Sequence, residues 1–285
     1  MFGFLNVYKT KGMTSHDVVA RLRRVTKIRQ IGHTGTLDPF AEGVLPICIG
    51  KATRLIEYLN DDKEYLATVQ FGTNTDTYDL EGEVTESFVK KVTQEEIEIA
   101  LKDFEGEISQ LPPIYSAIKV NGKKLYDYAR EGKDVEIQPR KVFVSKIELK
   151  NFDFEAQTAE IVVACSKGTY IRSIAYDLGQ KLNCGGHLIK LIRTKAGKFE
   201  IKNSTQLDDF ADEKNVDVKL INPLDMLDLP KLQITEDQHK KVLQGQYFNV
   251  DTNFDNNFLI LIYNNNISAV ALVEEGKVKV KKVFG

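Results

Sequence analysis

The chain has 285 residues, of which 42% are hydrophobic and 28% charged, and its formal net charge is −2. This composition is typical of a globular protein with a sizeable core, and the length indicates either two domains or one large domain with a small second one. No apolar run approaches the ~18 residues of a membrane span, and the N-terminus lacks the features of a secretory signal. The cysteines Cys48, Cys165 and Cys184 fit neither a zinc motif nor a disulfide framework, so we expect a reducing cytoplasm, no metal and no membrane partner.

The N-terminal part is predicted to form a strand, a helix and a glycine-rich turn. Apolar residues at 4–8 indicate the strand, and Thr14 offers an N-cap to a helix with Asp17 in its first turn. The run GHTGTLDPFAEGVL at 32–45 then places Asp38 between a glycine-dense turn and a proline. A carboxylate on a rigid turn is a candidate nucleophile or general base, although Asp-Pro pairs also start ordinary turns.

The middle of the chain is predicted to alternate between regular elements and one long insertion. Apolar and polar residues alternate over Tyr65–Phe71, which indicates a strand, and Thr93–Glu96 is a capping box that opens a helix. The stretch Gln110–Arg140 is rich in Pro, Gly, Lys and Tyr and lacks sustained periodicity. We interpret it as a partly ordered insertion, and loops of this length are often functional.

A second strand and helix follow the insertion. Glu160–Cys165 is rich in β-branched residues, and Gly168 opens a helix whose apolar stripe continues to Leu182. Arg172 lies in the first turn of this helix, off the stripe. A cation there is unfavourable for the helix dipole, so Arg172 has either a partner elsewhere in the fold or a place on the exposed surface.

A domain boundary is expected at Leu229-Pro230, which divides the chain into a domain at 1–229 and a small β-rich domain at 230–285. In the second domain the pattern predicts a helix over Glu236–Leu243, a strand over Phe258–Tyr263 and further strands to the end. The tracts 251–257 and 264–266 are predicted to be turns or loops.

The small net charge conceals strong segregation along the chain. Nine basic and four acidic residues give residues 1–60 a net charge of +5, whereas four basic and fourteen acidic residues give residues 61–110 a net charge of −10. Residues 117–150 and 166–202 carry net charges of +4 and +6. Three basic segments could together bind a polyanion if the fold gathers them on one face, and otherwise they are ordinary solvated surface.

The run at 32–45, with GKATR at 50–54, resembles the catalytic motif of the bacterial TruB family of tRNA pseudouridine synthases, which modify uridine 55 of the tRNA T-loop. Three further blocks agree: KEY at 63–65 with GTNTDTYD at 72–79, QLPPIYSAIK at 110–119, and CSKGTYIRS at 165–173 with LIRT at 191–194. The resemblance implies an α+β pseudouridine-synthase fold with a mixed, mainly antiparallel sheet, a thumb insertion at about 110–140, and a small PUA-like RNA-binding domain at the C-terminus.

The resemblance also implies an isomerase that flips the uridine out of the loop and converts it to pseudouridine without a cofactor or a metal. Asp38 would be the nucleophile, which attacks C1′, adds at C6 or assists a glycal route. Arg172 would hold this carboxylate bidentately and keep it ionised. Tyr65 would stack on the base and offer its hydroxyl to the C5 proton, unless it is an ordinary core residue of its strand.

The other residues that the resemblance assigns would bind substrate. His33 would enter the T-loop, or alternatively donate to the turn backbone, and Leu191 would lie on the other side of the base from Tyr65. Lys9 and Tyr170 would line the pocket. Phosphate contacts are expected from Lys51, Arg54, Lys119, Lys123, Lys124 and Arg130. The expected partner is the T-arm of tRNA, and the protein is expected to be a monomer.

Two other functions remain open at this point. A tRNA-folding factor that opens and reanneals the T-arm would need the insertion, the basic segments and His33, but neither Asp38 nor Arg172. An unrelated enzyme with an Asp38 nucleophile, such as a glycosidase, would need a second positioned carboxylate, for which Asp76 and Asp79 are available.

Overall fold

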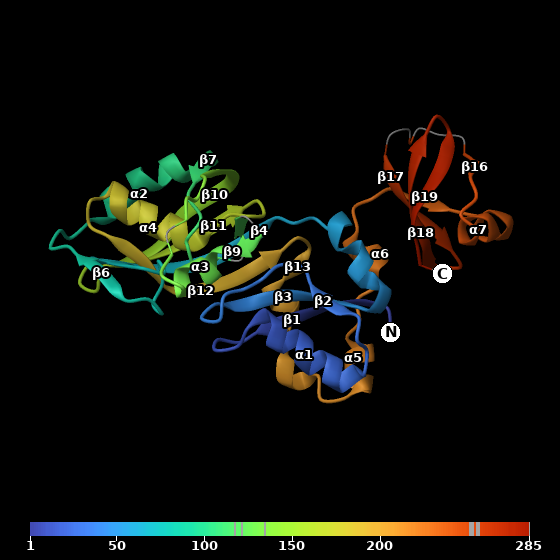
Figure 1. The fold of residues 1–285 in the computed structure, drawn as a ribbon, viewed down its shortest axis with the longest axis horizontal. Coiled ribbons are helices and arrows are strands. Elements are labelled where there is room, and N and C mark those ends of the chain that lie inside the picture. Colours follow the sequence, from blue (N-terminus) through green and yellow to red (C-terminus); the bar gives the residue numbers. More distant parts are fainter. Residues whose placement is uncertain (117, 121, 134, 251–253, 255–256, 285) are drawn as a thin grey trace.

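The computed structural model describes residues 1–116, 118–120, 122–133, 135–250, 254 and 257–284. Among these residues, ten strands form one mixed sheet in the larger part of the molecule, and five strands form a second sheet at its C-terminal end (Figure 1). Helices pack on the sheets, so the fold is α+β, as the sequence predicted.

The main sheet is mixed and mainly antiparallel, which confirms the prediction. Among its described strands, two pairs are parallel, β1 with β14 and β3 with β12, and the other pairs are antiparallel. The order across the sheet is β14 (Thr205–Gln206), β1 (Gly3–Lys9), β3 (Glu42–Ile49), β12 (Gly186–Ala196), β4 (Lys63–Phe71), β11 (Thr158–Cys165), β10 (Arg140–Asp153) and β7 (Gly106–Gln110). Two short strands lie off this path: β13 (Phe199–Glu200) pairs with β12, and β2 (Ile31–His33) pairs with β3.

Three helices of the larger part form where the sequence predicted them. The helix α1 (Ser15–Thr26) begins with a capping box between Thr14 and Asp17, and α2 (Gln94–Leu101) begins with one between Thr93 and Glu96. The helix α4 (Ile171–Lys181) packs on β12 and buries its apolar stripe. Buried apolar side chains from these helices join the inward-facing residues of β4 and β11 in one core.

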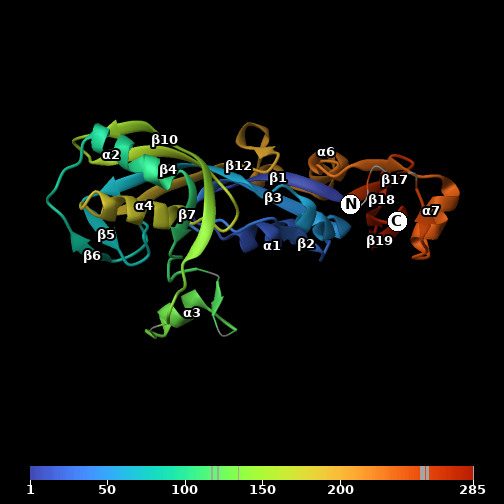
Figure 2. The same cartoon turned by 90° about the horizontal axis from the view of Figure 1, so that it is seen from above.

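The predicted insertion leaves the main sheet where β7 ends and returns where β10 begins. It contains a two-stranded ribbon of β8 (Lys119–Val120) and β9 (Lys123–Lys124), followed by α3 (Leu125–Arg130). Figure 2 shows α3 projecting away from the body of the molecule. We call residues 111–139 the thumb; residues 117, 121 and 134 lie outside the described part of the chain.

The C-terminal sheet is joined to the larger part by α5 (Glu213–Val218) and α6 (Pro223–Met226). Its order is β15 (Lys231–Gln233), β17 (Phe258–Tyr263), β18 (Asn266–Glu274), β19 (Lys277–Val283) and β16 (Phe248–Asn249). The helix α7 (Glu236–Leu243) and β17 have the predicted bounds, and Asn264 and Asn265 form the predicted turn. The predicted loop at 251–257 falls mostly outside the described residues.

A shared apolar cluster joins the C-terminal sheet to the main sheet. Phe4, Val44 and Leu55 from the larger part meet Ile260 and Phe284 from the C-terminal end of the chain, and all five are buried.

Within the acidic segment 61–110, β5 (Thr73–Thr75) pairs with β6 (Val84–Ser87) in a second two-stranded ribbon beside the main sheet.

Candidate active site

Asp38 lies on the loop between β2 and β3, and two buried side chains hold this loop in place. Ser15, the first residue of α1, accepts a hydrogen bond from the Leu37 N–H at 2.8 Å. The Lys9 ammonium at the end of β1 donates to the carbonyl of Ala41 at 2.6 Å and to that of Pro39 at 3.4 Å. The Asp38 side chain is 35% exposed and faces a pocket. The turn therefore presents a carboxylate from a fixed backbone.

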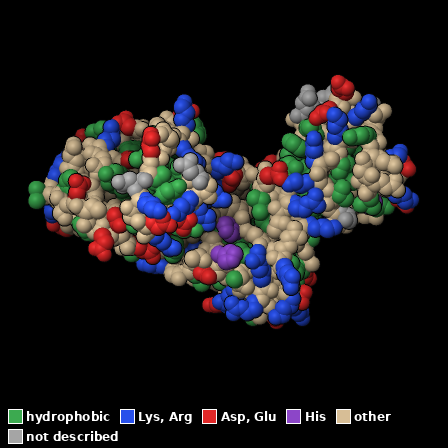
Figure 3. Space-filling view, viewed as in Figure 1, with side chains coloured by type: hydrophobic (Ala, Val, Ile, Leu, Met, Phe, Trp, Pro, Cys, Tyr) green, Lys and Arg blue, Asp and Glu red, His purple; other side chains and the backbone are tan. Residues whose placement is uncertain are grey.

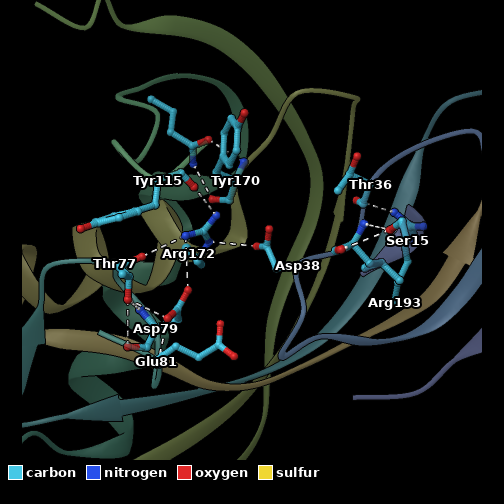
Figure 4. Close-up of polar contacts among 12 residues, drawn as sticks. Ser15, Thr36, Asp38, Thr77, Asp79, Glu81, Tyr115, Tyr170, Arg172 and Arg193 are labelled. Atoms are coloured by element: carbon cyan, nitrogen blue, oxygen red, sulfur yellow. Dashed lines mark hydrogen bonds and ion pairs between the residues drawn. The ribbon is translucent and has the colours of Figure 1, made fainter. Parts of the chain in front are cut away.

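Arg172 meets Asp38 from the first turn of α4, across the pocket floor (Figure 4). Its Nε lies 3.0 Å from Asp38 Oδ2, and its side chain is only 6% exposed. This confirms that the off-stripe arginine has a partner rather than a place on the surface. The pair joins segments 134 positions apart in the sequence, and the buried guanidinium meets a carboxylate that is still partly exposed.

The rest of the Arg172 guanidinium is held by other acceptors, which differs from the bidentate fork we expected. Its Nη1 donates to the Thr77 carbonyl at 3.1 Å and lies 3.3 Å from Asp79 Oδ2. Its Nη2 donates to the Tyr115 carbonyl at 2.9 Å. Because these three groups occupy the outer nitrogens, Asp38 is contacted through Nε, and the guanidinium is fixed even before substrate arrives.

Burial and the neighbouring charges act on the pKa of Asp38 in opposite directions. Burial in the pocket raises the pKa of Asp38, and the negative charge of Asp79 acts in the same direction. The positive charges of Arg172 and Lys9 lower the pKa but do not outweigh burial. Asp38 is therefore more basic than an exposed aspartate.

The pocket above this pair has a volume of about 480 Å³, and its lining combines aromatic and aliphatic side chains with polar and charged ones. Tyr65 on β4 and Leu191 on the neighbouring strand β12 are both buried in its wall. Tyr170, the N-cap of α4, also lines it, and its backbone N–H donates to Gln110 Oε1 at 2.7 Å. Tyr115 and Tyr126 line the side formed by the thumb.

Tyr65 is both a core residue and a pocket residue, so the two readings of it are compatible in this fold. Its side chain belongs to the main core, and Tyr65 is the cross-strand partner of Arg193. Burial raises the pKa of the Tyr65 hydroxyl, whereas the Arg193 guanidinium acts to lower it.

Arg193 is a residue of this site to which the sequence reasoning assigned no role. It is fully buried on β12 and donates to the carbonyls of Val44 at 2.7 Å, Gly35 at 3.1 Å and Thr36 at 3.3 Å. Its guanidinium thereby ties the loop before Asp38 to β3. Arg193 follows Leu191 by two positions on a strand, so the two side chains share a face, and that spacing could have indicated it.

Several predicted site residues lie apart from the pocket wall. Lys9 sits beneath the Asp38 loop, where its ammonium contacts backbone carbonyls, and burial lowers its pKa to about 8. His33 lies on β2 outside the pocket lining. Burial lowers the pKa of His33, and a hydrogen bond with the Gly35 backbone acts against this shift. Lys9 is therefore a support for the loop rather than a pocket residue.

The six predicted phosphate-binding cations fall into two groups. Lys51 donates to the Phe284 carbonyl at 3.1 Å and Arg54 to the Val283 carbonyl at 2.8 Å, so this pair lies against the end of the C-terminal sheet. The other four, Lys119, Lys123, Lys124 and Arg130, belong to the thumb. Figure 3 shows Lys and Arg side chains, interspersed with acidic ones, over several parts of the face drawn there.

No helix in the described part of the chain is long and apolar enough to cross a membrane. Within the same residues, no group of three or more His, Cys, Asp or Glu side chains is placed to hold a metal ion.

Comparison with known proteins defines first the class and then the family. The profile of the "TruB family pseudouridylate synthase (N terminal domain)" matches residues 23–171, and that of the "tRNA pseudouridylate synthase B C-terminal domain" matches residues 172–227. The fold is also that of a solved "Cbf5-Nop10-Gar1 Complex", with a TM-score of 0.74 and 26% identity over 100% of this chain and 85% of that one. The molecule is thus a pseudouridine synthase, with a curled C-terminal β-sheet of the PUA-like kind.

The particular family follows from the full-length relatives. The tRNA pseudouridine synthase B of Caldanaerobacter subterraneus is 43% identical over 99% of both chains, and that of Carboxydothermus hydrogenoformans is 43% identical over 100% of this chain and 99% of its own. The chain therefore belongs to the TruB family, the tRNA pseudouridine synthases B, and is an isomerase that acts on RNA.

Proposed function

We propose that the protein isomerises uridine 55 in the T-loop of tRNA to pseudouridine, with Asp38 as the nucleophile. The observation that carries this proposal is the ion pair of Asp38 and Arg172 at the floor of a pocket lined by Tyr65 and Leu191. The family supports the reaction class, and the pocket supplies a carboxylate where a flipped nucleotide would enter.

The reaction breaks the N1–C1′ bond of uridine, turns the uracil, and joins C5 to C1′, after which the proton on C5 is lost. A carboxylate suits the first half because it can attack as an anion and later leave. Three routes are consistent with the position of Asp38: attack at C1′, addition at C6, and assistance to a glycal intermediate. In each route Arg172 orients the Asp38 carboxylate and stabilises its negative charge.

Tyr65 and Leu191 would hold the uracil while it turns. An aromatic ring can stack on one face of a flipped base, and an aliphatic side chain can pack on the other face. Tyr65 would accept the C5 proton in the last step as tyrosinate, after its own hydroxyl proton has passed to solvent. The Arg193 guanidinium favours that ionisation, whereas burial, the larger effect, raises the pKa of Tyr65 and opposes it.

The thumb cations Lys119, Lys123, Lys124 and Arg130 would bind the phosphates of the T-arm, and His33 would enter the loop that the uridine leaves. In the free protein Lys123 forms an ion pair with Glu131 at 2.5 Å, and Lys124 donates to the Tyr126 hydroxyl at 2.9 Å. Lys123 would exchange its carboxylate partner for phosphate when the thumb closes on RNA. The small C-terminal domain at 230–285 would extend the RNA-binding surface.

The direct test is to map pseudouridine in tRNA transcripts after incubation with the protein. We expect one pseudouridine, at position 55, in a transcript with U55, and none in a matched transcript with C55. Pseudouridine elsewhere in the C55 transcript would contradict the assigned position. Full T-arm refolding activity without any pseudouridine in the U55 transcript would favour the tRNA-folding factor instead.

A further inference from the structure

Tyr78 has an unusual backbone conformation beside the active-site arginine. Its φ is +63°, in the left-handed region that bulky side chains rarely adopt. Among the described non-glycine residues with positive φ, Tyr78 is the aromatic one; the others are Lys27, Gln157, Asn183, Asn264, Asn265 and Glu275. A strained conformation persists where its surroundings enforce it, and such residues cluster at functional sites.

Three contacts hold Tyr78 in this conformation. Its ring stacks on that of Tyr176, with ring centroids 4.0 Å apart and planes inclined by 16°. The backbone N–H of Leu188 donates to the Tyr78 carbonyl at 3.0 Å, and the Tyr78 N–H donates to the Thr75 carbonyl at 3.2 Å. The stack is the part of this arrangement that depends on side chains.

The residues on either side of Tyr78 both face Arg172. The Thr77 carbonyl and the Asp79 carboxylate lie 3.1 Å and 3.3 Å from Arg172 Nη1 (Figure 4). The other oxygen of Asp79 accepts from the Glu81 N–H at 3.0 Å and from the Thr77 hydroxyl at 2.7 Å. The turn through Tyr78 therefore delivers two acceptors to one guanidinium nitrogen.

The ring that supports this turn comes from the same helix as the arginine. Tyr176 follows Arg172 by four positions on α4, so the two side chains emerge from adjacent turns of one helix face. Stacking Tyr78 on Tyr176 fixes the turn relative to α4. Because Arg172 and Tyr176 both belong to α4, this one helix then sets the distances from the guanidinium to the Thr77 carbonyl and the Asp79 carboxylate.

We propose that Tyr78 and Tyr176 are positioning residues: their stack holds the 77–79 turn against α4, so that Thr77 and Asp79 aim the Arg172 guanidinium at Asp38. This inference rests on the proposed function, in which Arg172 orients the nucleophile. Neither tyrosine is among the residues that line the pocket, so an effect on catalysis would pass through Arg172.

The test compares Tyr176→Ala, which removes the stack, with Tyr176→Phe, which keeps it, in single-turnover assays on U55 tRNA. We expect Tyr176→Phe to stay within about twofold of wild type and Tyr176→Ala to lower the rate of the chemical step about tenfold, with tRNA affinity unchanged. Adding Tyr78→Gly to Tyr176→Ala should restore part of the rate, because glycine adopts positive φ without strain. A structural role alone would lower the melting temperature but leave the rate of folded Tyr176→Ala intact, and that result would overturn the proposal.

A second readout is independent of turnover. The carboxyl of Asp38 can be titrated by NMR in protein carrying ¹³C-labelled aspartate, with Asp38→Asn to assign the signal. The groups that act on or respond to Asp38 are Arg172 from α4, Asp79 and Glu81 from the turn region, Lys9 from β1, and the hydroxyls of Tyr65 and Tyr170.

In Tyr176→Ala we expect the pKa of Asp38 to be higher than in wild type. The Arg172 guanidinium would be held less firmly beside Asp38 and would therefore lower its pKa less. An unchanged titration would overturn the positioning proposal even if the protein acted on no tRNA. If wild type shows no turnover but the titration of Asp38 still shifts in Tyr176→Ala, the proposed function alone would be contradicted.

Discussion

At the residue scale, the site depends on one carboxylate and one guanidinium that share a buried space. Asp38 is held by its backbone, through Ser15 and Lys9, and Arg172 is held by two hydrogen bonds to carbonyls and two ion pairs with carboxylates. Neither side chain has to be ordered when the substrate enters. The proposed catalysis therefore relies on preorganisation, whose electrostatic contribution is large in a site shielded from water.

The first prediction concerns the pH dependence of the reaction. Because the pKa of Asp38 is raised, the rate should begin to fall on acidification at a higher pH than it would with an aspartate of ordinary pKa. Arg172→Gln removes the main group that lowers this pKa, so the acidic limb of kcat/KM should move to higher pH and kcat should fall about 10²–10³-fold. The charge-matched control is Lys214→Gln on the exposed surface of α5. An acidic limb at the same pH in Arg172→Gln would show that Asp38 does not control it.

The second prediction concerns Lys9, whose ammonium is buried beneath the active-site loop. Burial lowers its pKa from 10.5 to about 8 in the folded protein. Between these two values the unfolded chain binds more protons at this position, so the contribution of Lys9 to the free energy of unfolding increases as pH rises. Compared with Lys9→Met, wild type should gain up to roughly 3 kcal/mol in stability between about pH 7 and pH 10. Urea denaturation across this range measures the difference, and a constant difference would contradict the pKa shift.

At the element scale, α4 is the element on which the site is built, because it carries Arg172 and Tyr176 and packs closely on β12. The close approach occurs at Gly179, where an added Cβ would lie 2.2 Å from backbone atoms of Gly185 and Gly186. Non-bonded atoms do not approach this closely, so the start of β12 can pack against α4 here only because Gly179 has no side chain.

The third prediction follows from this approach. In most helix interiors Gly→Ala stabilises a protein by roughly 1 kcal/mol. Here Gly179→Ala should instead destabilise by about 2–4 kcal/mol, because helix and strand must separate. It should also lower the rate of isomerisation, since Arg172 moves with the helix. Gln180→Ala, at the exposed neighbouring position, is the control. Denaturant midpoints of both variants decide the matter, and a stabilised Gly179→Ala would refute the packing argument.

How much of the fold the sequence predicts depends on whether an element has two different faces. The helices α1, α2 and α4 and the strand β4 have one buried face, and their periodicity predicted them, whereas the β-branched residues of β11 predicted that strand. The strand β3 was missed because Val44 to Ile49 are all buried, which removes alternation, and because Pro46 argues against a central strand.

Pro46 is tolerated because of how β3 is covered along its length. On the edge of β3 opposite β1, the strand β12 pairs only with the first two residues of β3, and β2 pairs only with the last three residues of β3. Between these two paired regions, the Arg193 side chain donates a hydrogen bond to the Val44 carbonyl, and the Thr34 N–H donates one to the Pro46 carbonyl. The strands β10 and β12 were missed for another reason, since register shifts at 144–146, 149–151, 188–190 and 193–195 break their alternation.

The site was predictable where a local motif carries it and not where distant segments meet. Asp38 and Arg172 stand in distinctive sequence blocks, and their pairing followed from the family resemblance. The sharing of the Arg172 guanidinium among Thr77, Asp79 and Tyr115 did not follow, because it depends on how the 77–79 turn and the thumb both approach one helix. The support that Lys9 gives to the Asp38 loop was hidden for the same reason.

At the scale of the whole molecule, charge and shape combine in the thumb. Lys119, Lys123, Lys124 and Arg130 all lie on this projecting segment, whereas Lys51 and Arg54 contact the C-terminal sheet. The thumb therefore gathers four cations on one projecting segment. This distribution makes a prediction about ionic strength.

The fourth prediction is that tRNA binding weakens steeply with salt and that the thumb accounts for part of the slope. Each neutralised phosphate contributes about 0.7–0.9 to the slope of log Kd against log salt concentration. The double variant Lys119→Gln, Lys124→Gln should reduce that slope by about 1.5. Lys102→Gln, an exposed lysine outside the thumb, should leave the slope unchanged. Equal slopes for wild type and the double variant would show that the thumb lysines do not contact phosphate.

The central claim is that this chain uses Asp38 to isomerise a tRNA uridine, and tritium release from tRNA labelled at uridine C5 tests it most directly. Wild type should release about one equivalent of tritium per tRNA, since one C5 proton is lost per turnover at a single site. Asp38→Asn, which keeps the size of the side chain and removes its charge, should release none while it binds tRNA as wild type does. Release by Asp38→Asn at a rate near that of wild type would contradict the account.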